Sequence, residues 1–429
     1  MTLRQPRPAV LLAYAAFVLI GVGAGGNGVL LPAQMADYGV SRPTIGITFF
    51  TLSAGYVLAS LFNGPVIDRF GVRTALVASG GAWAAAGAYT ATRPLFAAFA
   101  GVQVVIGGAI GILESVLNAY LAPLPDGTTR LNRLHGFFGA GALLGPVLAA
   151  WIVGFASWEA FNLTLAIACA PLALGFAVAY QGKAAPSTRE PTAKAPEARV
   201  LDPGAPGLGD GTAPTSPDSP SGGLLAVALR DRGVLLGAAM LAVYVGVEVG
   251  VGNWGFSYLV QARGFHSSLA GYLVSGYWLG LTAGRFLISP VVARTRLTVS
   301  GMMYCCLGGV TAAITLAWLS PAEGLTSGAL VLLGFFLGPI FPTTIAMVPR
   351  LTEARLGPTA IGVLNAGALV GGSVLPWLAG SIAQGTGIWT LLPFALALSV
   401  LQLAVWLPIS VRIRVGRDRA DGTVKSAVL

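Results

Sequence analysis

The chain has 429 residues, of which 55% are hydrophobic and only 10% are charged, and its mean hydropathy is +0.77. A soluble domain usually carries about one quarter charged residues, so the composition excludes an ordinary soluble protein and predicts an integral membrane protein. The net charge of +9 does not indicate a nucleic-acid partner, because the basic residues lie in short segments between apolar runs.

Apolar runs long enough to cross a bilayer recur along the whole chain. The first run follows Arg4 and Arg7 without a convincing cleavage site, which favours a membrane span over a removed signal peptide. Lipid offers no partner for backbone polar groups, so each span should be helical. The sequence therefore predicts twelve transmembrane helices, at 9–32, 44–63, 74–92, 94–122, 134–154, 158–180, 233–259, 268–292, 297–319, 325–348, 357–383 and 387–409.

The basic residues give these spans an orientation. If the N-terminus is cytoplasmic, all but four of the 25 Lys and Arg residues fall in cytoplasmic segments, as the positive-inside rule requires. The exceptions are Arg42, Arg93 and Arg263 in outer loops, and Arg285 within a span. We therefore expect a multi-pass protein of the inner (plasma) membrane with both termini in the cytoplasm.

The loop between the second and third spans reads "GPVIDRFGVR" and carries a regularly spaced charged motif. A generic charged turn is one interpretation of it. The interpretation that we favour is a cytoplasmic clasp, in which Asp68 faces the positive end of a helix or a nearby Arg and holds a gate closed. The residues assigned to this gate are Gly64, Asp68, Arg69, Gly71 and Arg73.

Glu114 interrupts the fourth span, in "GILESVLNAYLAP". A charged side chain at a helix centre costs roughly 2.5–3.5 kcal/mol or more, so Glu114 is a functional candidate. Its spacing from Gly107, Gly111 and Asn118 puts all four residues on one helix face. Burial would let this carboxyl take up a proton near neutral pH, which favours proton coupling. Direct hydrogen bonding to a solute and a structural ion pair are the alternatives.

The fifth span offers two further features. We expect His135 to open this helix near the cytoplasmic face as a capping or gating residue. The stretch "GALLGPVLAA" partly resembles a glycine–proline motif of drug–proton antiporters, but Ala149 and Ala150 replace its last two glycines. A close contact of small residues with a proline bend is the simpler interpretation.

A segment rich in Pro, Gly, Ser and Thr separates two sets of six spans. It cannot bury a core, so 183–230 should be a disordered cytoplasmic linker. The flanking units are then a six-helix bundle at 1–182, a second at 231–411 and a basic tail at 412–429. These halves are repeats, because 38–69 aligns without gaps on 263–294 and "GALLG" has a counterpart in "GALVG". The predicted fold is an all-α integral membrane protein of two pseudo-symmetric bundles.

The seventh span places Tyr244 and Glu248 on one face, with Asn253 and Trp254 beside it. An aromatic ring next to amides and a carboxylate suits a sugar, since the ring stacks on C–H faces while polar groups bind hydroxyls. The alternative is that Trp254 only anchors the helix near the outer interface.

Arg285 in the eighth span needs a carboxylate partner, most plausibly Glu248 and otherwise Glu114. Its alternative is to reach toward the cytoplasmic surface. A pair that forms and breaks with protonation could couple transport to protons, so we assign that role to Glu114, Glu248 and Arg285. Other candidates for the solute site, besides Asn118, Tyr244, Glu248, Asn253 and Trp254, are Asn27, Tyr56, Gln103, Tyr272, Tyr277, Thr343 and Asn365.

Two six-helix halves and the loop motif resemble the major facilitator superfamily, whose signature Gly-x-x-x-Asp-Arg-x-Gly-x-Arg the motif matches. "ESVLNAYL", "NRLHGFFGAGALLGP" and "YVGVEVGVGNWGFSYL" resemble the sugar-porter branch that includes bacterial fucose permease. The resemblance implies alternating access, and it implies that Glu114 and Asn118 handle substrate and proton. That branch also has an acid on its first helix, where this chain has Asn27.

The sequence thus predicts proton-coupled symport of a sugar or similar small polar solute. Proton-antiport efflux of a drug or metabolite is the first alternative, and a transporter-like receptor without turnover is the second. No nucleophile–base or metal constellation predicts an enzyme, and no cofactor is expected beyond an ion gradient, with Na⁺ as the alternative to protons. The expected partners are a small-molecule substrate and the lipid bilayer, for a monomer that binds no nucleic acid.

Overall fold

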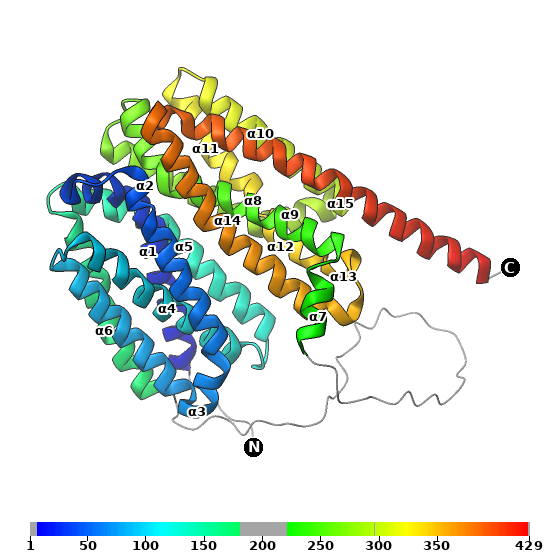
Figure 1. Cartoon of the computed structure of the whole chain (residues 1–429), viewed down its shortest axis with the longest axis horizontal. Coiled ribbons are helices and arrows are strands. Elements are labelled where there is room, and N and C mark those ends of the chain that lie inside the picture. Colours follow the sequence, from blue (N-terminus) through cyan, green and yellow to red (C-terminus); the bar gives the residue numbers. More distant parts are fainter. Residues whose placement is uncertain (1–6, 181–220, 296, 428–429) are drawn as a thin grey trace.

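The structure, a computed structural model, describes residues 7–180, 221–295 and 297–427, and these are helical with no strand among them. Figure 1 shows the first bundle in blue to teal and the second in green to red. The first bundle consists of α1 (Arg7–Tyr38), α2 (Arg42–Ile45), α3 (Ile47–Ala91), α4 (Phe96–Leu121), α5 (Gly127–Val153) and α6 (Trp158–Ala179).

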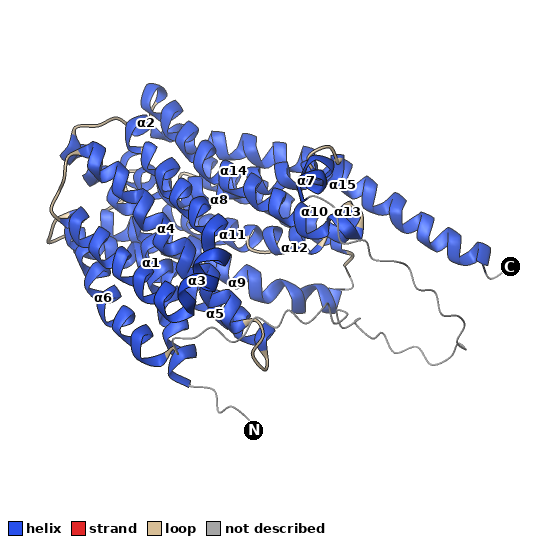
Figure 2. Cartoon of the chain, turned by 60° about the horizontal axis from the view of Figure 1, so that its bottom comes forward, coloured by secondary structure: helices blue, strands red, loops and turns tan. Residues whose placement is uncertain are grey.

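The second bundle follows a short helix, α7 (Ser221–Ala228). It consists of α8 (Arg232–Ser257) with the π-helix η1 (Tyr258–Ala262), α9 (Ser267–Thr295), α10 (Val299–Leu319), α11 (Glu323–Leu337), α12 (Ile340–Ala346), α13 (Val348–Leu351), η2 (Ala354–Leu356), α14 (Gly357–Thr386), η3 (Ile388–Thr390) and α15 (Leu391–Ala427). Figure 2 shows that both bundles are built of helices joined by loops.

The predicted spans coincide with these helices, which confirms the fold class. Spans two and three are joined in α3, where Gly71 forms the bend with φ 78° and ψ 161°. A positive φ of this kind favours glycine. The tenth span is divided between α11 and α12, because Pro339 cannot continue the backbone hydrogen bonds of a helix. Within the described ranges, nine helices are long and apolar enough to cross a membrane, and the bent segment of α2 and α3 is a tenth candidate.

The unit boundaries differ from the sequence prediction at two places. Most of the predicted linker, 183–220, lies outside the described residues, but its last part is helical in α7 instead of disordered. The reason is the apolar run Leu224–Leu229, which lets Ala228 be buried. At the other end, α15 continues through most of the predicted basic tail, as far as Ala427.

Successive spans run in opposite directions, so each bundle has two ends. We call the end where α1 begins and α15 leaves the bundle the terminal end, and the opposite end, which includes α2, the far end (Figure 1). Gly71 and the connection between α4 and α5 therefore lie at the terminal end. The connections that follow α1, η1 and α14 lie at the far end.

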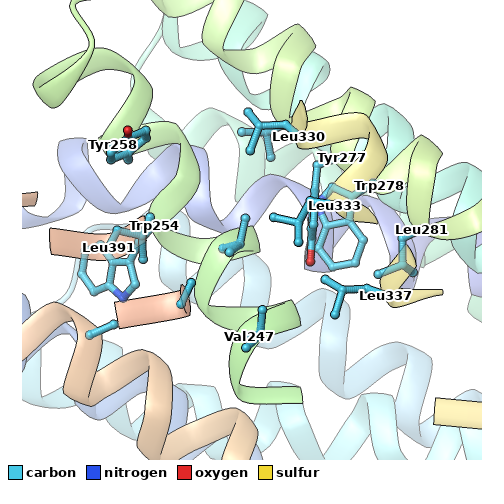
Figure 3. Close-up of a cluster of buried hydrophobic side chains, with 14 of the residues drawn as sticks. Val247, Trp254, Tyr258, Tyr277, Trp278, Leu281, Leu330, Leu333, Leu337 and Leu391 are labelled. Carbon is cyan, nitrogen blue, oxygen red and sulfur yellow. The ribbon is translucent and has the colours of Figure 1, made fainter. Parts of the chain in front are cut away.

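The core of the second bundle is a continuous set of large apolar side chains. Figure 3 shows part of it, with Trp254 of α8 beside Leu391 of α15, and Tyr277 of α9 among leucines from α9 and α11. Trp254, Leu333 and Leu337 are completely buried. This packing fixes α8 and α9, which carry Glu248 and Arg285, against their neighbours.

Glycines let helix backbones touch in the first bundle. A Cβ added to Gly107 of α4 would lie 1.9 Å from the carbonyl oxygen of Leu52, and one added to Gly55 of α3 would lie 2.0 Å from that of Val104. Small residues at such crossings allow the close packing that holds membrane helices together. The contact between α3 and α4 therefore tolerates no side chain at these positions.

We expect Gly107→Ala to destabilise the protein, because the added methyl group must push α3 and α4 apart, at a cost of about 1–3 kcal/mol. Gly101→Ala on the same helix is the control, since nothing lies within 4 Å of a Cβ there. Thermal unfolding of the purified protein in detergent should give a lower midpoint for Gly107→Ala alone. Equal midpoints for the two variants would contradict the packing argument.

Asp231 ties the terminal end of the second bundle together. It caps α8 by accepting hydrogen bonds from the amides of Gly233 at 2.6 Å and Val234 at 3.4 Å, and it accepts another from the Thr352 hydroxyl at 2.7 Å. Arg412 of α15 lies 3.5 Å away. Burial alone would raise the pKa of Asp231, but these hydrogen bonds and Arg412 outweigh it and hold the pKa below its ordinary value.

A lowered pKa in the folded state means that Asp231 contributes stability above its unfolded pKa, near about 4, and that this contribution is lost as the pH falls through the lowered value. At neutral pH, Asp231→Ala should lower the unfolding midpoint, by about 1 kcal/mol in free energy. The difference should shrink in detergent solutions below pH ~4. Glu353→Gln, which changes an exposed carboxylate, is the control, and a difference that stays constant into acid would rule out this role.

Candidate functional site

Glu114 of α4 is held by Tyr56 of α3. The Tyr56 hydroxyl donates a hydrogen bond to Oε2 of Glu114 at 2.7 Å. Gly111 brings the helices together here, since a Cβ added to it would lie 3.0 Å from the carbonyl oxygen of Tyr56. The glycine spacing on α4 therefore does more than allow packing, because it sets the distance from the carboxylate to its hydroxyl partner.

Asn118 shares the face of Glu114 but does not bind its carboxylate. Its amide donates instead to the backbone carbonyl of Glu114 at 2.8 Å, one helical turn earlier. The sequence predicted that Glu114 and Asn118 share a helix face. It named Tyr56 only as one of several candidates for the solute site. The partner was hard to find because it comes from another helix.

Glu248 and Arg285 form an ion pair between α8 and α9, with Nη2 of Arg285 3.2 Å from Oε1 of Glu248. This confirms the predicted partner and excludes, for this conformation, an Arg285 side chain that reaches only toward the surface. Tyr277 donates a hydrogen bond to the backbone carbonyl of Glu248 at 3.1 Å. The hydroxyl of Tyr244, which is completely buried, lies beside both charged groups.

His135 lies well inside α5, which begins at Gly127. The expectation that it opens and caps this helix is therefore wrong. The mostly polar residues 127–133 extend α5 on the N-terminal side of its apolar span, which begins at residue 134. The His135 ring contacts Phe17 edge-on, with the centroids 5.5 Å apart, and its charged neighbour is Arg285.

Asn27 and Asn253 join the two bundles. The amide of Asn27 on α1 donates to Oδ1 of Asn253 on α8 at 3.3 Å. Beside them, a Cβ added to Gly28 would lie 2.4 Å from the carbonyl oxygen of Gly252, so the two backbones are in contact. Two predicted solute residues from different halves are thus brought together.

Trp254 and Asn365 lie apart from this group. The Trp254 ring is completely buried and donates to the carbonyl of Pro376 on α14 at 2.8 Å, and Gly380 packs against its ring. In this conformation it offers no open face for a sugar to stack on. Asn365 is exposed on the terminal half of α14, and no hydrogen bond is described for its side chain.

At the far end, Arg42 of α2 binds the second bundle through three hydrogen bonds. Its Nη2 donates to Oε1 of Gln261 at 2.8 Å, its backbone amide donates to Oε1 of Gln384 at 3.1 Å, and its Nη1 donates to the carbonyl of Ala383 at 3.5 Å. The sequence marked Arg42 only as a basic residue of an outer loop. The outer loops carry few basic residues, so the presence of Arg42 in one of them was the sequence signal for a specific role.

Two more hydrogen bonds join the bundles in the far half. The Trp377 indole donates to the carbonyl of Pro43 at 3.2 Å, and the hydroxyl of Ser373 donates to that of Ser53 at 2.7 Å. Arg42, Asn27 and these two pairs account for the hydrogen bonds between bundles that the structure describes. All lie on the far-end side of α1, α2, α3, α8 and α14.

The loop motif at the terminal end is free of such contacts. Asp68, Arg69 and Arg73 are exposed, and nothing lies within 4 Å of a Cβ added to Gly64. In the described part of the chain no ion pair involves Asp68 and no hydrogen bond joins the bundles at this end. One flank remains packed, since Gly136 and Gly139 of α5 contact Phe286 and Thr282 of α9. Among the described residues, the loop motif therefore makes no contact with the second bundle, while hydrogen bonds join the bundles at the far end.

The described residues contain no group of three His, Cys, Asp or Glu side chains that could hold a metal ion. The polar groups between the hydrogen-bonded far end and the loop motif are instead a carboxylate with its hydroxyl, an ion pair and a pair of amides. Hydrogen bonding to a polar solute and transfer of a proton are the chemistry that these groups can perform.

The comparisons with known proteins agree with this arrangement. The sequence profile of the Major Facilitator Superfamily matches residues 13–330. "Bypass of stop codon protein 6" of Saccharomyces cerevisiae is 26% identical over 390 residues, which cover 87% of this chain and 76% of the yeast protein. A glucose/galactose transporter of Brucella abortus is 23% identical over 84% of each chain.

Solved structures share the fold. The nucleoside transporter NupG superposes with a TM-score of 0.74 at 13% identity, over 95% of this chain and all of NupG. The Escherichia coli fucose:proton symporter FucP gives a TM-score of 0.58 at 16% identity, over 95% of this chain and 99% of FucP. The resemblance seen in the sequence is thereby confirmed at the level of fold.

Because Arg42 closes the far end, Arg42→Ala should shift the protein toward a conformation open at that end. Hydrogen bonds to charged groups contribute about 1.5–3 kcal/mol each, and about 1.4 kcal/mol changes an equilibrium tenfold. A thiol at Asn253→Cys should therefore react at least several-fold faster with a bulky thiol reagent in Arg42→Ala. Arg263→Ala is the control, since the hydrogen bonds of Arg263 stay within the second bundle. Equal rates of thiol reaction in Arg42→Ala and Arg263→Ala would contradict the role of Arg42 in closing the far end.

Proposed function

The chain belongs to the Major Facilitator Superfamily, and on that premise we propose that it carries a sugar or similar small polar solute across the membrane together with a proton, by alternating access. The observation that carries this proposal is the pattern of contacts between the bundles. They are joined at the far end and disengaged at the terminal end, with paired polar groups between. Alternating access requires two such states, in which each end opens in turn.

The charge distribution supports an orientation for these states. The terminal end carries the motif arginines and the basic C-terminal part of α15, so we assign it to the cytoplasm of the inner (plasma) membrane. The structure then represents the state open to the cytoplasm. In the opposite state, Asp68 would be engaged and the hydrogen bonds of Arg42 would be broken.

Glu114 is our proposed proton site. It is a carboxyl group on a helix with no other charged residue, and its described side-chain partner is a neutral hydroxyl instead of a cation. A charge left alone in such a place opposes movement through the apolar region, whereas the protonated form does not. Protonation of Glu114 together with solute binding would thus permit the loaded protein to change state.

The solute class rests on two observations. The polar groups between the bundles are amides, hydroxyls and a neutral ion pair, which suit a hydroxyl-rich molecule. The Brucella relative is named a glucose/galactose transporter. The alternative of drug efflux is suggested by the glycine motif of α5 and by the apolar, glycine-rich helices of the cavity. Packing accounts for the motif, because a Cβ at Gly141 would lie 2.1 Å from the carbonyl oxygen of Val18.

We expect Glu114→Gln to abolish sugar accumulation driven by a pH gradient, because the side chain no longer takes up a proton. Exchange of labelled for unlabelled solute at equal pH should continue, because it needs no net proton movement. Both rates can be measured in proteoliposomes that contain the purified protein. The size of the loss should be tenfold or more, within the range for removal of one proton-transfer group.

Glu353→Gln is the matched control, since this carboxylate is exposed and its ion-pair partner among the described residues is exposed Arg355. It should transport as the parent protein does. If Glu114→Gln still accumulates solute on a pH gradient, the proton role is wrong. If only a Na⁺ gradient drives accumulation by the parent protein, the proposed coupling to protons is wrong, while the proposed transport function stands.

A further inference from the structure

The facing surfaces of α8 and α9 carry hydrogen-bond donors that have no acceptor. Nε of Arg285, the hydroxyl of Tyr244 and Nε1 of Trp278 are each buried without a hydrogen-bond partner among the described residues. The Tyr244 side chain is completely buried, and Trp278 is 7% exposed. A buried donor without a partner is costly, so each unpaired group calls for an explanation.

These donors lie on one strip. Tyr244, Glu248 and Gly252 follow one another at four-residue intervals on α8, so they share a face. On α9, Trp278 and Arg285 are seven residues apart and also share a face, about 10 Å apart along the helix axis. The two faces meet, because a Cβ added to Gly252 would lie 2.9 Å from the Trp278 ring. Gly252 thus leaves the room that the indole occupies.

Apart from the Glu248 carboxylate, the strip presents donors. Arginine and the indole can only donate, and the Tyr244 hydroxyl lies beside both the Glu248 carboxylate and the Arg285 guanidinium without a hydrogen bond of ordinary geometry to either. Only one hydrogen bond of the guanidinium is described, to Glu248. Donors spaced along two facing helices, one of them a cation, suit a ligand that carries acceptors, and a carboxylate fits the fork of an arginine.

We propose that the solute carries a carboxylate, which binds Arg285 and Tyr244, and that its hydroxyl chain extends along the strip to the Trp278 indole. The substrate class is then a hydroxylated monocarboxylic acid, such as an aldonic acid, instead of a neutral sugar. This inference rests on the proposed transport function and narrows its solute.

The charge balance explains why the acid carries a single charge. The Glu248–Arg285 pair is neutral, so one bound carboxylate adds one negative charge, and one co-transported proton restores neutrality. The titratable groups that face this site are Tyr244 on α8, Tyr277 on α9 and His135 on α5. A phosphate ester with two charges would leave the site negative, which burial opposes.

The test compares each neutral aldose with its aldonate, glucose with gluconate and galactose with galactonate, on the purified full-length protein. Thermal shift measures binding, and counterflow in proteoliposomes measures transport. We expect each aldonate to bind at least tenfold more tightly than its aldose and to support counterflow. Arg285→Gln should remove this preference.

Tyr244→Phe and Trp278→Phe should each weaken aldonate binding about tenfold. Because neither donor makes a hydrogen bond of ordinary geometry to the described residues, both variants should keep the unfolding temperature of the ligand-free parent, which a merely structural role would not allow. Trp406→Phe is the control: it removes another buried indole donor without a partner, on α15, and should leave aldonate binding unchanged.

If aldoses support counterflow and bind as tightly as aldonates, the carboxylate site is overturned while the proposed sugar transport stands. If the Tyr244→Phe and Trp278→Phe variants bind aldonates as tightly as the parent protein does, the proposal that the acid binds along this strip is also overturned. If neither class supports counterflow, the proposed function fails together with this inference.

Discussion

Contact between helix backbones at glycine is the constraint on which this structure depends. In lipid, helices gain little from burying apolar side chains against each other, so close packing has to hold them together. Gly55, Gly107 and Gly111 bring α3 against α4, and Gly28 brings α1 against α8. The same approach that packs the helices also positions Tyr56 against Glu114 and Asn27 against Asn253. Packing and site geometry therefore have one origin, and neither could change without the other.

The two bundles use their polar groups differently. In the first, a carboxylate is held by a hydroxyl, which leaves its charge uncompensated. In the second, Glu248 and Arg285 compensate each other but leave donors without acceptors. An uncompensated acid suits a proton, and unused donors suit an acceptor-rich solute. The halves of a repeated fold have thus acquired complementary chemistry, although their glycine frameworks still correspond.

Much of this could be predicted from the sequence, because lipid leaves few choices. The spans follow from hydropathy, and the partner of Arg285 follows from the scarcity of buried carboxylates. The roles of Tyr56 and Arg42 could not be predicted in this way, since their partners lie on other helices. Helical periodicity shows which residues share a face of one helix, but not which residues of two helices meet. For Trp254 the sequence suggested a wrong role. Its neighbours in sequence suit a sugar site, but its ring packs against α14. The place of His135 was misjudged because hydropathy marks the apolar part of a helix and not its true beginning.

The π-helix η1 gives the closed far end a particular mechanical property. Gln261, which accepts a hydrogen bond from Arg42, lies within this wider turn at the end of α8. A π turn holds one more residue than an α turn and is less stable. If it reverted to α geometry, Gln261 would swing by about 100° around the helix axis and away from Arg42. A register change inside one turn would therefore break one of the three hydrogen bonds that Arg42 makes to the second bundle, without bending or sliding any of the long helices.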